Sequence, residues 1–421
     1  MAIKPDEAEP IRCELSTPRA APEGYNRGGV RSLQIDNPRQ RALVRLADAV
    51  LTPVAWWPSR PREVHRILLL RLERIGDLLM ALEAIADVRA AFPSATIDLA
   101  VGSWNAPIAA LIPGITTVHV ADVPWLTRGE QPTSWGTILH AASGWRARGY
   151  DLVINFEPDI RSNMLARMTG APIRLGYASG GGGPLLTHIS TYDPTTHVAD
   201  NARRLVATIA PVGGLAKTTT SRRLTPTPDQ VARVDQLLAP HPRPLIGVHV
   251  SGGRASKQWH PDRFAAVAAA VAATTSGTIV LTGATSDVPM VAAVQATLTG
   301  TRVVSFAGAL DLPESAALFD RLDVLITGDT GPMHLAAAMG TPVVALFGPS
   351  DPARYGPRAR SERILRVQLP CSPCGQVRLP PVRCRGKVPD CMDGITVDAV
   401  VAATLELLAP TPGPTLRTAE C

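Results

Sequence analysis

Three glycine-containing loops carry the residues of this 421-residue chain that could do chemistry. The first loop, Arg71-Leu-Glu-Arg-Ile-Gly-Asp77, directly follows a short apolar run. Gly76 permits a tight turn, and Asp77 is expected at the N-terminal end of the next helix. Asp77 could accept a proton while Arg71 and Arg74 hold anionic groups of a ligand. Taken alone, the pattern favours a simple helix cap, because aspartate is common at helix starts.

The second loop, between residues 250 and 261, combines glycines with a positive charge. Ser251 is followed by Gly252 and Gly253, which let backbone amides approach a ligand, and Lys257 comes four residues later. The pattern is neither a Walker loop nor a GxGxxG fingerprint. It indicates phosphate binding, with a surface turn carrying a solvated lysine as the alternative.

The third loop gives the strongest signal. A strand is expected to end at Asp329, and Thr330 and Gly331 then open a helix. Free backbone amides and a threonine hydroxyl at a helix N-terminus suit a pyrophosphate. His334 lies in the first helical turn, close enough to join them. Because Asp329 and Thr330 lie next to it, His334 is interpreted as a ligand-binding residue rather than a purely structural one.

Gly283 and Asp287 form a fourth candidate site. They resemble a strand-end ribose site, because a carboxylate can accept hydrogen bonds from two sugar hydroxyls. A negative charge that simply stabilises a helix N-terminus explains Asp287 equally well.

Four cysteines lie close together in the sequence and open with a CxxC pair: Cys371, Cys374, Cys384 and Cys391. Their spacing is compatible with a structural zinc site. Reduced thiols in a loop are the alternative, and two disulfides are less expected in a reducing compartment. A thioredoxin-like role is disfavoured because the CxxC pair stands in a proline-rich loop.

Alternating strands and helices must position these loops. Short apolar runs predict buried parallel strands at 67–72, 96–101, 118–121, 151–156 and 173–177, and again at 245–250, 278–282, 303–306, 324–327 and 343–347. Helices are expected between the strands, for example at 77–91, 161–168 and 197–210. Two such sets joined by a proline-rich link predict an α/β protein with two Rossmann-like domains facing a central cleft. Ligands are expected at the carboxyl ends of the strands.

The amino-terminal part precedes both sets. Residues 1–36 lack periodicity and are expected to form a disordered tail. Asn37 and the following proline then resemble a helix start, and an amphipathic helix is expected as far as Leu51. Three arginines lie mostly between its apolar residues: Arg39, Arg41 and Arg45. A helix of this kind, with Trp56 and Trp57 at its end, could lie on an anionic bilayer. Packing of this helix on the domain that follows it is favoured over binding to a bilayer.

The amino-acid composition and net charge exclude some classes of protein. The chain is 45% hydrophobic, which excludes a wholly disordered protein. Its 42 Lys and Arg against 36 Asp and Glu give a formal charge of +6, compatible with anionic ligands or a membrane surface but too small to imply nucleic acid. No apolar run approaches the ~18–20 residues of a transmembrane helix, and no secretory signal is evident. A cytoplasmic protein is expected, with peripheral contact at the inner face of the membrane as an addition.

These loops also resemble a known family. Gly76-Asp77, Ser256-Lys-Gln-Trp259 and Gly328-Asp-Thr-Gly-Pro-Met-His-Leu335 occur in the order found in glycosyltransferase family 9, the ADP-heptose:lipopolysaccharide heptosyltransferases. The similarity covers roughly Arg66 to Leu408. The resemblance implies a GT-B fold, with the acceptor bound to the first domain and the nucleotide-sugar to the second.

The resemblance also implies roles for single residues. The family's catalytic base corresponds to Asp77, and its phosphate-binding lysine to Lys257. Four positions correspond to donor-binding residues: Asp329, Thr330, Gly331 and His334. Where family members often carry glutamate for the ribose, this chain offers Asp287, one methylene shorter. Arg71 and Arg74 stand where acceptor contacts are expected.

The predicted function is inverting transfer of a heptose from ADP-heptose to a hydroxyl of a lipopolysaccharide-core-like saccharide. The sequence contains no Asp-x-Asp pair of the kind that holds a divalent ion on a diphosphate, so no catalytic metal is expected. A related transferase acting on a natural product or another glycan, with another nucleotide-sugar, is the alternative. A non-catalytic nucleotide- or zinc-binding module is disfavoured, because a binder needs no base in the opposite domain.

These interpretations divide the chain into successive segments. We expect a disordered tail at 1–36, the amphipathic helix and a linker at 37–60, an acceptor domain at 61–217, a second linker at 218–244, a nucleotide-sugar domain at 245–410 with the cysteine-rich loop at 371–391, and a tail at 411–421.

Overall fold

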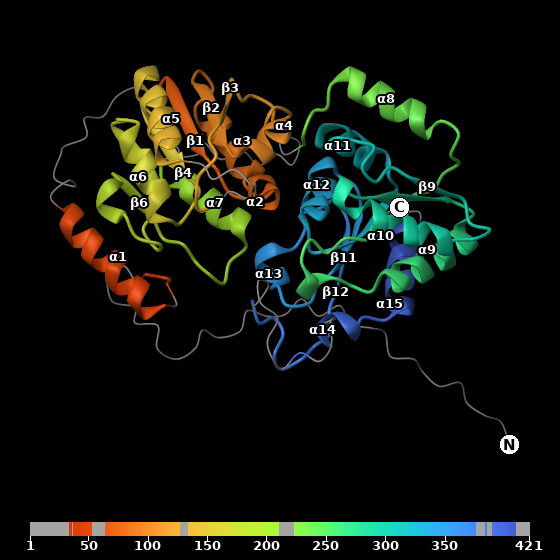
Figure 1. The fold of residues 1–421 in the computed structure, drawn as a ribbon. Helices are drawn as coiled ribbons and strands as arrows, with labels where there is room; N and C mark the ends of the chain where they lie inside the picture. The colour runs from red at the N-terminus through yellow and green to blue at the C-terminus, as the bar shows by residue number, and fades with distance from the viewer. Residues whose placement is uncertain are drawn as a thin grey trace, which may run out of the picture. The chain divides into compact units, whose positions relative to one another are not determined.

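The chain forms two β-sheets, each accompanied by helices (Figure 1). The computed structural model describes residues 33–35, 37–52, 64–126, 134–209, 223–375, 384 and 390–409. All strand pairs formed by these residues are parallel. Parallel sheets are covered on both faces, which explains why their central strands are continuous apolar runs. The predicted α/β class and the two Rossmann-like domains are confirmed.

The first sheet has the strand order β3-β2-β1-β4-β5-β6. Its strands are β1 (Arg66–Leu70), β2 (Thr96–Val101), β3 (Thr117–Val120), β4 (Leu152–Asn155), β5 (Ile173–Tyr177) and β6 (His188–Ser190). The order reverses between β1 and β4, so the loops that follow these two strands diverge and leave a crevice at their carboxyl ends. The Asp77 loop follows β1 and therefore borders this crevice.

The second sheet repeats the arrangement in the order β12-β11-β10-β7-β8-β9. Its strands are β7 (Leu245–His249), β8 (Thr278–Thr282), β9 (Val303–Ser305), β10 (Val324–Gly328), β11 (Val343–Leu346) and β12 (Glu362–Leu365). Here the reversal lies between β7 and β10. The Lys257 loop follows β7 and the Asp329 loop follows β10, so both border the second crevice.

Helices connect the strands and cover the sheets. The described helices are α1 (Pro38–Leu51), α2 (Ile75–Met80), α3 (Leu82–Ala91), α4 (Ala106–Ala109), α5 (Trp135–Arg148), α6 (Ile160–Met168), α7 (Val198–Ala207), α8 (Pro228–Leu238), α9 (Pro261–Thr275), α10 (Val288–Thr297), α11 (Leu312–Arg321), α12 (Gly331–Met339), α13 (Pro352–Tyr355), α14 (Asp390–Asp393) and α15 (Val397–Leu408). Short 3-10 turns add η2 (Ser103–Asn105), η3 (Gly183–Leu185), η5 (Ala255–Lys257) and η6 (Thr285–Asp287). In the described part of the chain, no helix is long and apolar enough to cross a membrane.

The expected elements mostly lie where the sequence predicts them, with one division. The helix expected at 77–91 is two helices, α2 and α3, and it begins at Ile75. Ala81 separates them, because its N–H donates to the carbonyl of Leu78, only three residues back. No proline or glycine marks this break in the sequence. Most of the predicted tail at 1–36 lies outside the described part, as do the predicted tail at 411–421, the Trp56–Trp57 pair and residues 210–222. Residues 33–35 of the predicted tail are described, and the N–H of Gln34 donates to the carbonyl of Ser179 at 2.8 Å, so this end of the tail packs on the first domain.

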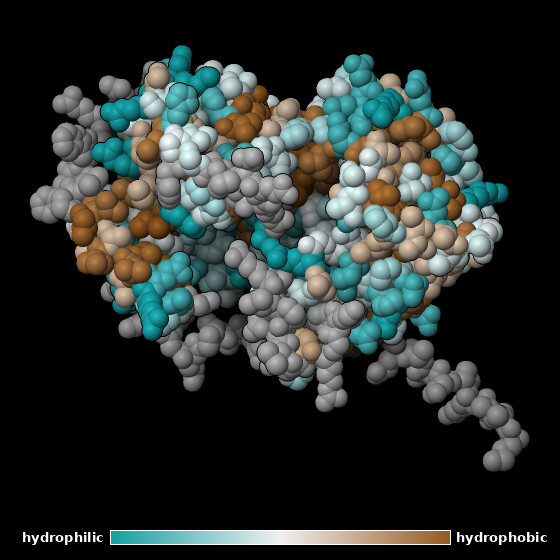
Figure 2. All heavy atoms as spheres, in the orientation of Figure 1, coloured by the Kyte–Doolittle hydropathy of each residue, from teal (hydrophilic) through white to brown (hydrophobic). Residues whose placement is uncertain are grey.

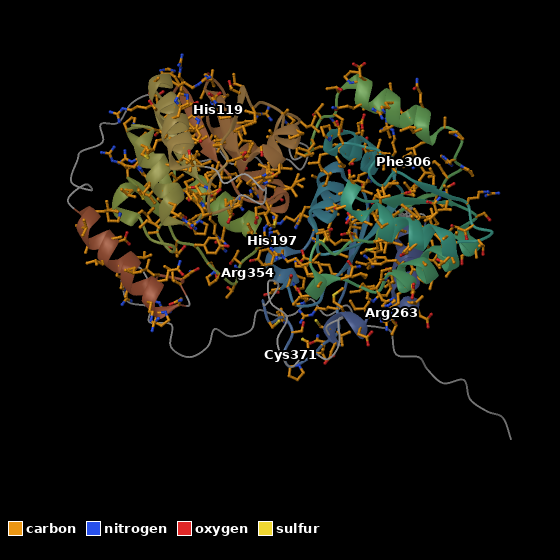
Figure 3. The ribbon with its side chains drawn as sticks, in the orientation of Figure 1. His119, His197, Arg263, Phe306, Arg354 and Cys371 are labelled. Atoms are coloured by element: carbon orange, nitrogen blue, oxygen red, sulfur yellow. The ribbon has the colours of Figure 1, made fainter. Side chains whose placement is uncertain are left out.

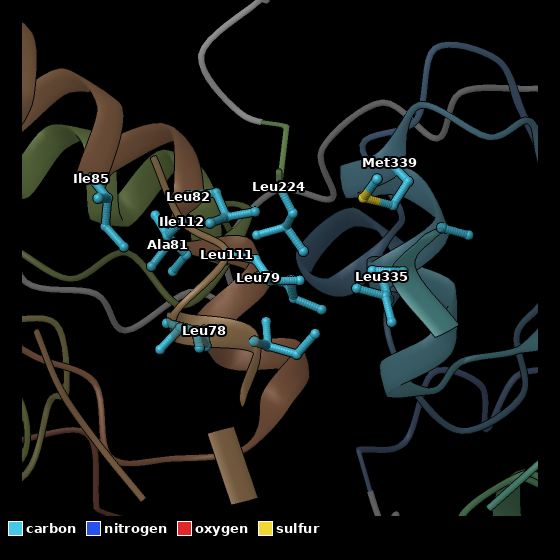
Figure 4. Close-up of a cluster of buried hydrophobic side chains, with 14 of the residues drawn as sticks. Leu78, Leu79, Ala81, Leu82, Ile85, Leu111, Ile112, Leu224, Leu335 and Met339 are labelled. Atoms are coloured by element: carbon cyan, nitrogen blue, oxygen red, sulfur yellow. The ribbon is translucent and has the colours of Figure 1, made fainter. Parts of the chain in front are cut away.

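One hydrophobic cluster runs through both domains (Figure 4). Leu78, Leu79 and Leu82 from α2 and α3 belong to the same buried cluster as Leu335 and Met339 from α12. Burying apolar surface is the main favourable contribution to folding and association. The two domains are therefore packed together beside the loops that carry the predicted site residues.

Candidate active site

The N-termini of α2 and α12 meet across the two domains. A Cβ added to Gly76 would lie 3.0 Å from Cδ2 of His334, and one added to Gly331 would lie 2.5 Å from Cγ2 of Ile75. Only glycine leaves room for this approach at Gly331, because a branched side chain offers little freedom to move away. The structure thus brings the loop of the predicted base, Asp77, against the helix of the predicted donor site.

Asp77 is the third residue of α2 and is held by its surroundings. Its Oδ2 accepts a hydrogen bond from the N–H of Arg74 at 3.3 Å, so the helix-cap interpretation describes a real contact. Its Oδ1 lies 3.6 Å from Nη2 of Arg71, and its side chain remains 26% exposed. Capping therefore leaves part of the carboxylate accessible.

Arg71 lines the crevice beside Asp77, but most of its guanidinium is engaged by protein groups, and an acceptor contact stays a prediction. It is 3% exposed, and its Nε donates to the carbonyl of Asp77 at 3.1 Å while Nη1 donates to the carbonyl of Phe156 at 2.8 Å. Nη1 also pairs with Glu73 at 3.0 Å. These contacts fasten the β1 loop to the β4 loop and orient Asp77. Arg74, by contrast, is exposed at the start of α2.

A cavity of about 290 Å³ opens beside Asp77, near the lower end of typical ligand-pocket volumes of about 300–1,000 Å³. Its walls include the tyrosines Tyr177 and Tyr192 from the first domain and Tyr355 from α13 of the second. Tyr177 and Tyr192 meet edge to face, with ring centroids 5.2 Å apart. Aromatic walls of this kind suit the apolar faces of sugar rings.

Arg354, at the cavity wall, contributes a guanidinium from the second domain (Figure 3). Its group stacks on the ring of Tyr355 at 5.0 Å, and its Nε is buried without a hydrogen-bond partner among the described residues. A buried donor left unpaired is costly, so this Nε marks the Arg354 guanidinium as a group of the cavity wall whose hydrogen bonding is incomplete. Nothing in the local sequence around Arg354 singles it out.

Carboxylates accumulate around Arg71. Burial raises the pKa of Glu73 to about 8, with repulsion from Asp77 adding to the effect. Burial likewise raises the pKa of Glu157 to about 6, against the attraction of Arg71. The Glu157 carboxylate accepts a hydrogen bond from the N–H of Leu72, which joins the β4 and β1 loops at the point where the strand order reverses. Arg71 is thus the shared counter-ion of the crevice.

The Lys257 loop is shaped by its glutamine. Gln258 accepts a hydrogen bond from the N–H of Gly252 at 2.7 Å and donates to the carbonyl of Val250 at 2.8 Å. The N–H of Gly253 donates to Oγ of Ser251 at 3.4 Å. In this structure, then, the two glycine amides predicted to approach a ligand are engaged within the loop. Gln258 was missed from the sequence although it belongs to the Ser-Lys-Gln-Trp motif.

Lys257 reaches the third loop. Its ammonium lies 2.6 Å from Oδ2 of Asp329 and 3.2 Å from the carbonyl oxygen of the same residue. This pair joins the loops after β7 and β10 at the second strand-order reversal. Trp259, two residues on, is buried and donates to the carbonyl of Ile395 at 3.2 Å, which anchors the loop in the core. Lys257 is thereby held at the start of α12.

The N-terminus of α12 carries no side-chain cap. Thr330 is the N-cap residue, but its hydroxyl lies 3.2 Å from Oγ1 of Thr327 rather than on the helix amides. Such uncapped N–H groups suit an anion. Burial lowers the pKa of the nearby His334 to about 4, so its imidazole is neutral at neutral pH. Lys257 therefore brings the positive charge to this helix start, where Asp329 pairs with it in this structure.

Gly283 and Asp287 lie at the carboxyl end of β8, next in the sheet to β7. Asp287 accepts a hydrogen bond from the N–H of Ala284 at 2.9 Å and is the N-cap residue of α10. Gly283 packs closely on it, because an added Cβ would lie 2.9 Å from Cβ of Asp287. The helix-start interpretation is observed here. A ribose contact stays a prediction.

Cys371, Cys374 and Cys391 are free thiols in the structure, so no disulfide joins the four clustered cysteines to one another and the disulfide alternative is not observed. Burial and the neighbouring thiols raise the pKa of Cys391 to about 11. No group of three or more His, Cys, Asp or Glu side chains within the described residues is arranged to hold a metal ion. The predicted zinc site at Cys371, Cys374, Cys384 and Cys391 is therefore not supported.

Comparison with known proteins decides the family. Residues 139–379 match glycosyltransferase family 9 (heptosyltransferase), which is more than half of the chain. The chain belongs to glycosyltransferase family 9. This match includes the Lys257 and Asp329 loops of the transferase but begins after Asp77.

Longer similarities extend across the transferase. The lipopolysaccharide core heptosyltransferase OpsX of Haemophilus influenzae is 23% identical over 306 residues, or 72% of this chain and 84% of that protein. Lipopolysaccharide heptosyltransferase 2 of Escherichia coli is 23% identical over 72% of this chain and 88% of its own length.

Solved structures share the fold. A glycosyl transferase family 9 structure from Veillonella parvula aligns with a TM-score of 0.67 and 25% identity, covering 82% of this chain and 97% of that one. The E. coli ADP-heptose lipopolysaccharide heptosyltransferase II aligns with a TM-score of 0.65 and 20% identity, covering 82% and 98%. The transferase therefore has the predicted GT-B fold.

Proposed function

We propose that this transferase moves a heptose from ADP-heptose to a hydroxyl of a lipopolysaccharide-core-like saccharide, with inversion and with Asp77 as general base. The observation that carries the proposal is the contact between Gly76 and His334, which sets the Asp77 loop of one domain against the donor-type helix of the other. A base and a phosphate-binding helix in opposite domains are what a direct transfer between two bound sugars requires. Cytoplasmic location belongs to the same proposal.

The donor proposal rests on the second crevice. Lys257 and the uncapped amides of α12 offer positive charge and hydrogen-bond donors for a diphosphate, while Asp287 lies at the neighbouring strand end for a ribose. ADP is favoured as the nucleotide because solved relatives of this fold hold it, including E. coli heptosyltransferase WaaC with ADP and with ADP-2-deoxy-2-fluoro heptose.

The proposed chemistry is one displacement. The acceptor hydroxyl attacks the anomeric carbon, its proton passes to the Asp77 carboxylate, and the bond from that carbon to the diphosphate oxygen breaks with its electron pair leaving on ADP. Negative charge grows on the diphosphate, where Lys257 and the α12 amides would stabilise it. Arg71 acts as a positioning residue that orients Asp77. Protein groups would thus stabilise the charge on the departing diphosphate in place of a divalent ion.

The acceptor proposal rests on the cavity beside Asp77. Its tyrosines suit a saccharide, and Arg354 supplies a guanidinium with an unpaired Nε. Because the guanidinium of Arg71 is already held by backbone carbonyls and carboxylates, Arg354 is the arginine of this wall that is best placed to hold an anionic group on the acceptor.

Thermal stability of the purified chain with ADP, UDP, GDP or dTDP tests the donor assignment. A nucleotide at about 100 times its dissociation constant should stabilise the fold by about 2.7 kcal/mol. We expect ADP alone to raise the melting temperature, equally with and without chelator, and Lys257→Ala to abolish the shift. A shift with UDP or dTDP instead would retain a glycosyltransferase but replace ADP-heptose as donor.

A further inference from the structure

Helix α1 carries an apolar stripe that faces solvent (Figure 2). Leu43, Leu46 and Val50 are 67%, 62% and 70% exposed, the highest values among the exposed large hydrophobic side chains of the described residues. Their spacing of three and four residues places them on one side of the helix. Single exposed apolar residues are ordinary on protein surfaces, but three aligned on one helix indicate a binding surface.

The opposite side of α1 is firmly attached to the first domain. Val44 is buried against Gly181, where an added Cβ would lie 2.2 Å from Cγ1 of Val44. Asp48 accepts a hydrogen bond from the N–H of Gly182 at 2.7 Å. The expected packing of this helix on its domain is thus observed, and it accounts for the inner face only. The stripe on the outer face is left for another partner.

The charge on α1 indicates which partner fits. Arg39 and Arg45 are exposed, whereas Asp48, the acidic residue of the helix, is turned towards Gly182. By helical spacing, Arg39 lies on the same side as the stripe, one turn before Leu43. An apolar stripe beside arginines matches the acyl boundary and the anionic head groups of a bilayer.

The apolar surface of α1 is connected to the cavity by the chain segment that leads into the helix. Gln34, just before the helix, lines the cavity that contains Asp77. Its side chain donates to the carbonyl of Tyr192 at 2.8 Å, and its N–H donates to the carbonyl of Ser179 at 2.8 Å. The chain segment that leads into α1 is therefore part of the acceptor-side wall.

We propose that α1 docks the protein on an anionic phospholipid bilayer through Leu43, Leu46 and Val50, with Arg39 and Arg45 on the lipid head groups. A lipid-linked saccharide could then enter the cavity from the membrane surface. A second copy of the chain is the alternative occupant of this surface, and the oligomeric state of the variants tests it. The docking itself does not depend on the identity of the sugar transferred.

Flotation of the full chain with vesicles tests this proposal. We expect binding to vesicles of mixed phosphatidylcholine and phosphatidylglycerol, little binding to phosphatidylcholine alone, and weaker binding when salt shortens the screening length from about 10 Å at 0.1 M to about 3 Å at 1 M. Leu46→Glu/Val50→Glu should reduce binding roughly tenfold or more. Arg39→Ala and Arg45→Ala should each reduce it about fivefold.

The control is Leu237→Glu on α8, which changes another partly exposed leucine and should bind like the wild type. ADP-dependent thermal stabilisation should be the same in all variants, which separates this proposal from the donor assignment. The proposal is overturned if the wild type does not bind anionic vesicles or if the α1 double variant binds as well as the wild type. It is also overturned if that variant turns an oligomer into a monomer, since a second copy would then occupy the stripe.

Discussion

His334 is a neutral side chain at the point where the two domains meet. Burial lowers its pKa to about 4, and His197 and Lys257 act in the same direction against the attraction of Asp329 and Asp77. A neutral imidazole packs against the backbone of Gly76 without a desolvated charge, which would be costly there. At the scale of single residues, the contact between the domains therefore depends on keeping His334 unprotonated.

This state of His334 predicts a pH dependence of stability. Its folded pKa of about 4 is below the unfolded value of about 6.5, so the unfolded chain binds more protons between these values. The stabilising contribution is present above about pH 6.5 and is lost as the pH falls towards about 4. We expect the free energy of unfolding of the wild type, relative to His334→Gln, to be lower at about pH 5 than at about pH 7.5 in urea titrations. An equal difference at both values would show that His334 titrates normally.

Arg71 shows what residue-level sequence reasoning lacks. The sequence indicates an arginine in a loop beside a possible ligand, and the structure holds this arginine at 3% exposure on backbone carbonyls and carboxylates. Whether a charged side chain meets a ligand or its own loop depends on the β4 loop, some 85 residues away. No local pattern contains that information.

At the scale of elements, the site depends on how closely two helix starts approach. Gly331 opens α12 directly over Ile75, the first residue of α2. Nearby, Leu79 of α2 and Leu335 of α12 belong to the same buried cluster. Because closely packed interiors adjust little to added volume, a methyl group at Gly331 should shift one helix against the other.

Gly331→Ala should therefore lower the turnover of the transferase and destabilise it by about 1–3 kcal/mol, the usual effect of overpacking. The matched control is Gly144→Ala in α5, where an added Cβ meets nothing within 4 Å and where alanine should stabilise the helix by about 0.5–1 kcal/mol. Adding Ile75→Ala to Gly331→Ala removes the obstructing atom and should restore part of the turnover. If Gly331→Ala were as active as the wild type, helix approach would not limit the reaction.

The elements themselves were predictable where burial dictates the pattern. Central strands such as β1, β7 and β10 are buried throughout or nearly so, and their apolar runs identify them. The edge strands β6 and β12 were missed, since each is short or only half buried and β12 begins with Glu362 and Arg363. Helix α5 was also missed, because no clear apolar periodicity marks it.

The residues of the candidate site also fall into two groups, those that the sequence could identify and those that it could not. Asp77, Lys257, Asp329 and His334 stand in short motifs next to strand ends, so the sequence could identify them. Tyr177, Tyr192 and Arg354 line the cavity from three separate segments and meet only in the folded chain. Local spacing cannot predict such a wall.

At the scale of the whole molecule, polar contacts add to the shared hydrophobic cluster. Arg358 of the second domain lies 3.2 Å from a carboxylate oxygen of Glu83 and 2.5 Å from one of Asp200, both in the first domain. His197 lies at the same boundary and its Nε2 is 3.0 Å from the carbonyl oxygen of Gly356 (Figure 3). Base and donor helix thus belong to different domains that these contacts hold together.

The most direct test of the account is therefore transfer from ADP-heptose to a heptose-deficient lipopolysaccharide core oligosaccharide by the wild type and Asp77→Asn. The amide preserves size and can still accept the hydrogen bond from Arg74, but it is no base. We predict transfer by the wild type, a loss of about 10²–10⁴-fold in turnover for Asp77→Asn, and unchanged stabilisation of both proteins by ADP. Undiminished turnover in Asp77→Asn, or no transfer by a wild type that still binds ADP, would contradict it.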